Sequence, residues 1–256
     1  MAKTRFIDLS VTIVTNPPGS FNPAEITYTL HEESARVRSK ALNLPEDFFP
    51  EGMLAAEEMI TLHSHVGTHL DAPWHFGVTP GGKPAKTIEE VPLEWCYSDG
   101  VVLDFSHKKA GELISAEDVQ EALDKIKYKL KPFDIVLIRT DASKHYGKPG
   151  YENMHPGMGR ESTLWLIEQG IKVMGIDAWG WDRPFSVAMQ EYEETGNKEA
   201  FLPAHFVMRE KEYCHLENLG NLDDLPVPYG FKVSVFPVKI QRGSSGWVRA
   251  VALLEE

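Results

Sequence analysis

Residues 63–75 read His-Ser-His-Val-Gly-Thr-His-Leu-Asp-Ala-Pro-Trp-His, and they contain four of the ten histidines of the chain together with one aspartate. Imidazole nitrogens and carboxylate oxygens are ligands that suit Zn²⁺, Mn²⁺ or Fe²⁺. Gly67 lets the chain turn sharply between two candidate ligands, and Pro73 stiffens the exit from that turn. One histidine alone would more simply be a core or surface residue. Three histidines and an aspartate at this spacing instead favour a metal or catalytic site.

Strand patterns surround this cluster. Residues 59–65 alternate so that Ile60 and Leu62 share one face and the histidines share the other, as in a strand with one buried side. Further strands are predicted at residues 5–14, 26–30, 101–105, 135–139, 173–177, 233–240 and 247–254. We expect the strand at 26–30 to pair with the first one.

Helix patterns occur only in the middle of the chain. Ser115 begins a Ser-x-x-Asp pattern that predicts a helix to about residue 129, and Gly170 ends a second helix over residues 163–169. Because strands and helices alternate in the middle while both ends are strand-only, the sequence predicts an α/β fold with a mixed sheet and flanking helices. No Gly/Ser-rich linker divides the chain, so one domain is expected over residues 1–256. Long loops are expected at about 141–160 and 178–200, and such loops are often functional.

Composition and charge limit the possible functions. The chain has 256 residues, of which 42% are hydrophobic and 25% charged. No run approaches the ~20 apolar residues of a membrane span, and the first eight residues lack the apolar run of a signal peptide. The net charge is −12 and the basic residues are scattered, which disfavours nucleic acid as a partner. Cys96 and Cys214 form no Cys-x-x-Cys pair, so we expect two reduced thiols in a cytoplasmic protein with a small-molecule substrate.

The histidine-rich stretch resembles the H-x-G-T-H-x-D-x-P-x-H signature of the metal-dependent "putative cyclase" family, whose members include bacterial kynurenine formamidases and isatin hydrolases. The resemblance is carried by His65, Gly67, Thr68, His69, Asp71, Pro73 and His75. It implies that His65, His69 and Asp71 hold a metal and that His75 transfers protons as a general acid and base. It also implies a compact α/β domain with a mixed sheet that assembles as a homodimer or homotetramer.

A second block extends the resemblance. In the binuclear formamidases a histidine and, twelve residues later, a glutamate in a Leu-Glu-Asn-Leu run complete a second metal site, and His205 and Glu217 match this pattern. The resemblance therefore implies one or two divalent metals per chain, Zn²⁺ or Mn²⁺, with Asp71 and Glu217 as candidate bridging ligands. Isatin hydrolases are similar in length and around Arg139, but they lack this glutamate and hold one metal. Taken alone, a glutamate in this context is more often a solvated loop residue.

Four aromatic residues lie beside the proposed ligands in sequence or at pocket positions of the family: Trp74, Phe76, Trp179 and Trp181. Aromatic side chains fill cores more often than they bind substrates, but for four of them on loops a substrate pocket for an aromatic compound is an equally good interpretation. The formamidase pattern has a serine where this chain has Gly180. A long insertion follows, and it includes Met189, Tyr192 and Phe201.

Three other histidines lie outside the residues that carry the resemblance. His63 is expected to be structural or to orient a ligand. His155 is expected to be a loop residue that could reach the pocket. The Cys214-His215 pair could form a soft metal site, but a buried free thiol is the commoner arrangement.

These observations predict a metal-dependent hydrolase that cleaves a small amide, either an aryl formamide or an isatin-like lactam. A bound metal lowers the pKa of water towards ~7, and a histidine can carry the proton to the leaving nitrogen. No Gly-x-Ser-x-Gly run supports a serine hydrolase. The alternatives are a dienelactone-type lactone hydrolase, a non-catalytic metal or aromatic-ligand binding protein, and a lyase that uses the metal only as a Lewis acid.

Overall fold

The computed structural model describes residues 3–15, 24–45 and 47–255. The chain forms two units, which are described separately: the sheet unit, residues 1–13 and 64–256, and the hairpin unit, residues 14–63. The expectation of one domain over residues 1–256 stays a prediction.

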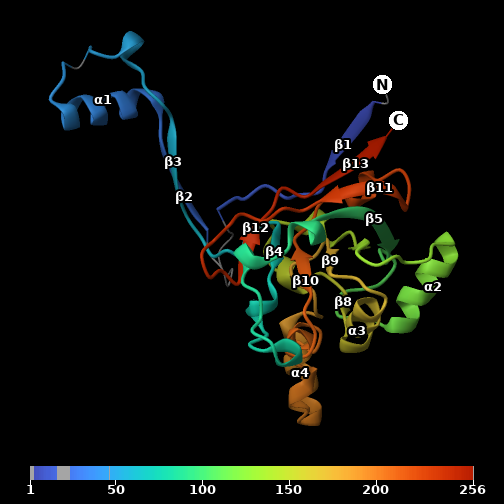
Figure 1. Cartoon of the computed structure of the whole chain (residues 1–256). Helices are drawn as coiled ribbons and strands as arrows, with labels where there is room; N and C mark the ends of the chain where they lie inside the picture. The colour runs from blue at the N-terminus through green and yellow to red at the C-terminus, as the bar shows by residue number, and fades with distance from the viewer. Residues whose placement is uncertain (1–2, 16–23, 46, 256) are drawn as a thin grey trace. The chain divides into compact units, whose positions relative to one another are not determined.

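The sheet unit is built on one curled nine-stranded sheet (Figure 1). Its order is β1-β13-β11-β5-β7-β9-β10-β4-β12. The central strands β5, β7, β9 and β10 are parallel, whereas the strands at both ends of the sheet pair antiparallel. The predicted α/β fold with a mixed sheet is therefore confirmed. The strands are β1 (Thr4–Asp8), β4 (His69–Asp71), β5 (Tyr97–Asp104), β7 (Ile135–Arg139), β9 (Val173–Ile176), β10 (Cys214–Glu217), β11 (Tyr229–Ser234), β12 (Ser245–Trp247) and β13 (Val251–Glu255).

The sheet unit also contains the helices α2 (Ala116–Ile126), α3 (Arg160–Glu168) and α4 (Phe185–Thr195), and the short parallel strands β6 (Leu113–Ile114) and β8 (Gly157–Met158). The predicted N-terminus of α2 is confirmed. The Ser115 hydroxyl accepts a hydrogen bond from the Asp118 N–H at 3.1 Å, and the Asp118 carboxylate accepts one from the Ser115 N–H at 2.7 Å. This reciprocal pair satisfies two N–H groups that a helix start would otherwise leave free.

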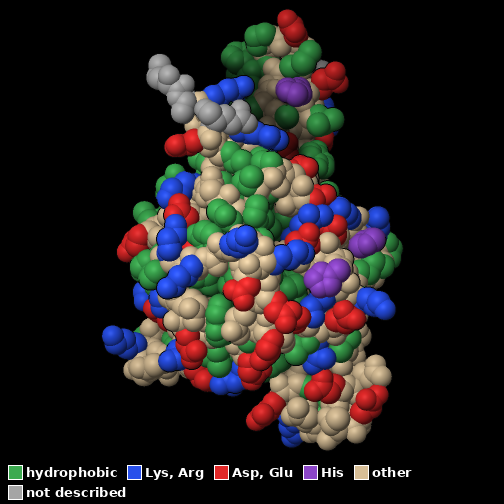
Figure 2. All heavy atoms as spheres, turned by 90° about the vertical axis from the view of Figure 1, so that its right-hand side faces the viewer, with side chains coloured by type: hydrophobic (Ala, Val, Ile, Leu, Met, Phe, Trp, Pro, Cys, Tyr) green, Lys and Arg blue, Asp and Glu red, His purple; other side chains and the backbone are tan. Residues whose placement is uncertain are grey.

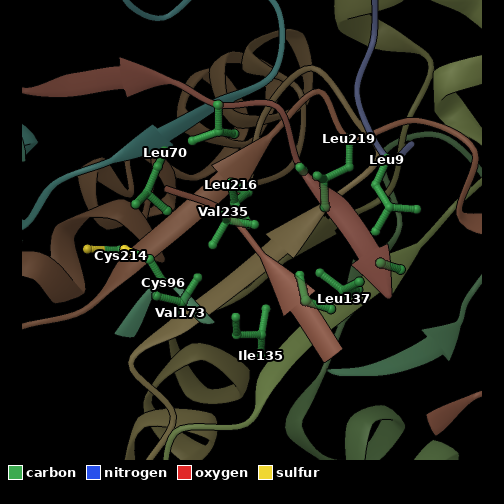
Figure 3. Close-up of a cluster of buried hydrophobic side chains, with 14 of the residues drawn as sticks. Leu9, Leu70, Cys96, Ile135, Leu137, Val173, Cys214, Leu216, Leu219 and Val235 are labelled. Atoms are coloured by element: carbon green, nitrogen blue, oxygen red, sulfur yellow. The ribbon is translucent and has the colours of Figure 1, made fainter. Parts of the chain in front are cut away.

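Apolar side chains form a separate buried cluster on each face of the sheet. Leu70 of β4 and Leu216 of β10 lie in the first cluster, together with the free thiols Cys96 and Cys214 (Figure 3). Because successive side chains of a strand point to opposite faces, the neighbours of these leucines must point the other way. Those neighbours are the polar residues of the candidate site.

The hairpin unit contains β2 (Glu25–Thr29), the helix α1 (His31–Leu42) and β3 (Glu57–Thr61). The two strands pair antiparallel with each other. The expectation that residues 26–30 pair with the first strand was wrong, since β1 pairs with β13 instead. The helix α1 has no counterpart among the predicted elements.

Several predicted boundaries were also wrong. The strand expected at 59–65 ends at Thr61, and the chain then turns over residues 64–68. The strand expected at 233–240 ends at Ser234, three residues before Pro237, which has no N–H to donate to a ladder. The strand expected at 247–254 is divided between two strands. The first, β12, pairs with β4, and the second, β13, pairs with β1 and β11. The loop expected at 178–200 contains α4.

Charges of both signs are interspersed over the face of the molecule in Figure 2. Several are paired on the sheet: Lys232 with Asp99 at 2.5 Å, and Arg139 with Asp104 at 3.5 Å. Among the residues that the structure describes, no helix combines the length and the apolar character that crossing a bilayer requires.

Candidate metal centre

The polar side chains of β4 and β10 gather on one face of the sheet. The antiparallel register pairs His69 with Glu217 and Asp71 with His215. Since paired residues share a face and side chains alternate, all four point to the same side. All four are buried. The backbone pairing alone therefore brings together two imidazoles and two carboxylates in the interior.

Asp71 lies at the centre of this group, with imidazole nitrogens around both of its oxygens. Its Oδ1 atom lies 2.9 Å from Nδ1 of His65 and 3.3 Å from Nε2 of His69. Its Oδ2 atom lies 3.2 Å from Nε2 of His215 and 3.6 Å from Nε2 of His75. Asp71 thus contacts four histidines: His65 and His69 through Oδ1, and His215 and His75 through Oδ2.

Glu217 also contacts histidines through both of its carboxylate oxygens. Its Oε2 atom lies 3.6 Å from Nε2 of His69, and its Oε1 atom lies 3.4 Å from the Nε2 atoms of both His205 and His215. The Nε2 atom of His205 also lies 3.9 Å from Oδ2 of Asp71. The predicted residues from the two blocks of sequence are therefore brought together in one site.

Local structure in the first block aims the rings. Gly67 adopts a positive φ of 70°, and its carbonyl accepts a hydrogen bond from Nδ1 of His69 at 2.8 Å. This bond leaves Nε2 of His69 free to face the carboxylates. His65 has its Nε2 atom 3.0 Å from the Ser244 hydroxyl, so its Nδ1 atom faces Asp71. A short 3₁₀ helix (Pro73–His75) then turns the last histidine of the motif back towards the strand.

Asp182 positions His205. Its carboxylate lies 2.5 Å from Nδ1 of His205 and accepts hydrogen bonds from the backbone N–H groups of Ala204 and His205, at 2.7 and 2.9 Å. A carboxylate that holds the far nitrogen of an imidazole is a recurrent partner of metal-ligating histidines, because it fixes the ring and its tautomer. No sequence pattern indicated this role for Asp182.

The carboxylates are held in their charged form. Burial raises the pKa of Asp71, but His75, His65 and His69 outweigh this and hold it well below its usual range. Burial likewise raises the pKa of Glu217, whereas the imidazoles of His205 and His215 lower it further than burial raises it. Two negative charges therefore lie within the protein, surrounded by nitrogens.

The histidines are shifted in opposite directions. Burial lowers the pKa of His75 to about 4, because Asp71 compensates only in part and other imidazoles oppose a further positive charge. Burial also disfavours charged His205, but Asp182 and Glu217 raise its pKa to about 10. Asp71 similarly overcomes burial at His69 and raises its pKa to about 9. His75 is thus a neutral base near pH 7.

The donor set fits a divalent metal. Within the described part of the chain, Nε2 of His69, both oxygens of Asp71 and both ring nitrogens of His215 are buried without a hydrogen-bond partner. Unpaired buried polar atoms are costly, and a cation would satisfy them. Two groups have their ligand atoms within 4.8 Å of one another: Asp71, His205, His215 and Glu217, and His65, Asp71 and His75.

The sequence raised His215 only as half of a possible Cys-His site and did not place it among the other ligands. Its spacing to Glu217 held the signal, because His-x-Glu in a strand places both side chains on one face. Cys214 precedes it in the same strand and points into the apolar cluster on the other face (Figure 3). The buried free thiol that the sequence favoured is therefore confirmed, and Cys214 does not join His215 in a soft site.

The predicted aromatic residues occupy different environments. The ring of Phe76 lies 4.7 Å from that of His75 and 4.8 Å from that of His205, so it borders the site. Trp74 has 42% of its surface exposed. Contact of either residue with a substrate stays a prediction.

The other two tryptophans lie on the loop after β9. Trp181 is fully buried, stacks on His215 with ring centroids 5.6 Å apart, and donates its backbone N–H to Glu217 at 2.8 Å. Trp179 is partly buried with its ring 5.3 Å from Phe185. A Cβ at Gly180 between them would lie 3.9 Å from Oε1 of Glu217, so the departure from the formamidase pattern faces the site.

The sequence did not decide the roles of two further histidines, His63 and His155. His63 is exposed and belongs to the hairpin unit. His155 is fully buried; its Nδ1–H donates to the Pro156 carbonyl at 2.8 Å, and its Nε2 atom has no partner among the residues described. It belongs to neither group of candidate metal ligands.

Comparison with known proteins gives consistent matches. A family model described as "Putative cyclase" matches residues 7–183. An isatin hydrolase of Roseibium aggregatum is 24% identical over 217 residues, covering 81% of this chain and 78% of that protein. A kynurenine formamidase of Bordetella petrii is 27% identical over 192 residues, covering 75% and 78%. The structure of isatin hydrolase A from Ralstonia solanacearum superposes with a TM-score of 0.76 at 25% identity, covering 98% of this chain and 92% of that one.

Proposed function

This chain belongs to the cyclase family, and we propose that it is a metal-dependent hydrolase that cleaves the C–N bond of a small amide or cyclic amide. The substrate class is an aryl formamide or an isatin-like lactam. The observation that carries the proposal is the buried pair Asp71 and Glu217, whose oxygens face histidine nitrogens that lack other partners. Similarity to two amide-cleaving hydrolases supports the same reaction.

The site would hold one or two divalent ions, Zn²⁺ or Mn²⁺. His65, His69 and Asp71 would hold one ion, and His205 and Glu217 would contribute to holding the other, with both carboxylates shared. When bound, such an ion supplies hydroxide at neutral pH and polarises the substrate carbonyl. The nitrogens and oxygens present are the donors that these ions accept.

His75 is proposed to move the proton. It is neutral near pH 7, so its Nε2 atom can accept a proton from the attacking water. Water adds to the carbonyl carbon, the C–N bond breaks, and the same histidine returns the proton to the leaving nitrogen. The products are an acid and an amine, which remain in one molecule when the substrate is a ring.

Aromatic side chains support an aromatic substrate. Phe76 borders the two histidines at the edge of the site, and Trp179 lies on the loop that carries Gly180. A homodimeric or homotetrameric assembly, taken from the family resemblance, and a cytoplasmic location, taken from the two free thiols, are further parts of the proposal.

The test starts from protein stripped of metal by a chelator and reloaded with Zn²⁺ or Mn²⁺. Aryl formamides, isatin-like lactams, cyclic imides and unsaturated lactones are then compared in ¹⁸O-labelled water. We expect metal-dependent turnover of an amide, with ¹⁸O in the product carboxylate. Turnover of lactones alone would favour the lactone hydrolase, and turnover without label would favour a lyase. If these compounds bind but none is turned over, the remaining hypothesis is a non-catalytic metal or aromatic-ligand binding protein.

A further inference from the structure

We propose that His215 is a metal ligand and that Asp71, His205, His215 and Glu217 form the tighter of two metal positions. These four residues are called the deep set. The motif set consists of His65, His69 and Oδ1 of Asp71. The inference rests on the proposed function, because it concerns metal ions in the same centre. It assigns the residues that hold each ion and the position that fills first.

The deep set is a closed group of four donors. The Nε2 atom of His215 lies 3.2 Å from Oδ2 of Asp71 and 3.4 Å from Oε1 of Glu217, and His205 lies equally close to Glu217. All four ligand atoms fall within 4.8 Å of one another, and all four residues are buried. One ion at their centre would therefore contact two histidines and two carboxylates.

The ring of His215 is held in this direction by its surroundings. Trp181 stacks on it at an interplanar angle of 18°, and the ring of His205 meets it edge-on with centroids 4.5 Å apart. The strand register fixes its backbone opposite Asp71. Packing alone does not explain a histidine here, because within the described structure neither ring nitrogen has a hydrogen-bond partner.

The number and enclosure of donors set the order of filling. Zinc positions with four protein ligands are typically closed and structural, whereas those with three keep an open place for water or substrate. The deep set has four donors, and Asp182 fixes one of its two histidines. The motif set has three donors, and its His65 side chain is 20% exposed. The deep position therefore binds first and shapes the site, and the motif position keeps the open place.

The experiment compares metal affinities of purified variants. Metal-free protein is titrated with Zn²⁺ against a coloured competing chelator, and retained metal is measured after gel filtration. The variants are His215→Leu for the deep set and His65→Ala for the motif set. His155→Gln is the matched control, since it changes a buried histidine that belongs to neither set.

We expect the wild type and His155→Gln to show a tighter and a weaker position. In His215→Leu the dissociation constant of the tighter position should rise by more than ~100-fold, because losing a ligand costs more than losing a residue behind it. His65→Ala should lose the weaker position and keep the tighter one. If His215→Leu does not fold, His215→Gln keeps a similar volume and carries the same expectation.

A purely structural role for His215 predicts a different pattern. It would lower the unfolding midpoint of the metal-free variant and leave both dissociation constants unchanged. The proposal expects the dissociation constant of the tighter position to rise in His215→Leu whatever happens to that midpoint, because His215 also lies 3.2 Å from Asp71 and its loss affects the metal-free protein as well. Unchanged affinities in His215→Leu, or loss of the tighter position in His65→Ala, would overturn it while leaving the hydrolase proposal intact. A wild type that binds no Zn²⁺ would overturn both.

Discussion

Asp71 and His215 are paired opposite each other in β4 and β10, and their side chains also meet, with Oδ2 of Asp71 3.2 Å from Nε2 of His215. The position of the central carboxylate is therefore set by the hydrogen-bonded ladder of the sheet and not by a loop. A site built on strands keeps its geometry without a ligand, which explains why donors can lie buried and unpaired in this arrangement.

Replacing Asp71 by asparagine should abolish metal binding at both positions. The two oxygens of this carboxylate face both sets of histidines, and an amide offers neither the charge nor a second carboxylate oxygen. Metal content per chain, measured after dialysis against Zn²⁺, should fall to near zero. Circular dichroism should show the fold retained, because the apolar clusters are untouched. Full metal content in Asp71→Asn would contradict the assignment.

Glu217→Ala should leave one ion per chain. Glu217 contacts both histidines of the deep set, whereas His65, His69 and Asp71 do not depend on it for their own contacts. Stoichiometric titration of metal-free protein with Zn²⁺ or Mn²⁺, with activity followed in parallel, should show two equivalents in wild type and one in the variant. A single equivalent in both would identify a mononuclear enzyme and shift the preferred substrate towards cyclic amides and lactones.

His75→Gln should keep its metal and lose roughly 10²–10⁴-fold in turnover, the usual contribution of a positioned acid and base. Glutamine occupies similar space but cannot carry the proton. Turnover and metal content are measured on the same preparation. If metal and activity disappear together, His75 is a ligand and another group carries the proton.

Asp182→Asn should weaken the deep position about 10–100-fold, the typical loss when the residue behind a ligating histidine is changed. Asp182 touches no proposed ion but fixes His205 through its Nδ1 atom and backbone. Competitive Zn²⁺ titration measures the loss. Asp177→Asn serves as control, because Asp177 is equally buried but holds Thr140 and Asp141 instead. Equal losses in both variants would indicate a general effect of buried carboxylates.

The sequence predicted those parts of the molecule that are encoded locally. The buried parallel strands at 135–139 and 173–177 have continuous apolar runs, and the motif from His65 to His75 is contiguous, so both could be recognised. For His215 the His-x-Glu spacing indicates a shared face with Glu217, but its position beside Asp71 arises only when β10 pairs with a strand far away in sequence. The strand β4 is three residues long and mostly polar, which gives no periodic signal of its own.

The last prediction concerns the stability of the metal-free protein as pH rises. Burial is outweighed at His69 and His205 by their carboxylate partners, which raise the two pKa values to about 9 and about 10. The unfolded chain releases these protons near the ordinary value of about 6.5. The raised pKa values of His69 and His205 therefore stabilise the folded protein. This stabilisation is complete below about pH 6.5 and is lost as the pH rises through the pKa values of the folded state.

The free energy of unfolding of metal-free protein should consequently fall between about pH 7 and 8, by up to about 1.4 kcal/mol per pH unit for each retained proton. The lowered pKa of His75 changes the stability only below about pH 6.5, so it adds no slope within this window. The raised pKa of the buried Cys96 thiol changes the stability only at pH values above the window. Urea unfolding at several pH values, with chelator or with saturating Zn²⁺, measures the effect. The Zn²⁺-loaded protein should show a flatter dependence, since an ion replaces the protons, and metal-free Asp182→Asn should also flatten because His205 loses its partner. Stability of the metal-free wild type that is constant or rising over this range would show that the imidazoles of the empty centre are neutral.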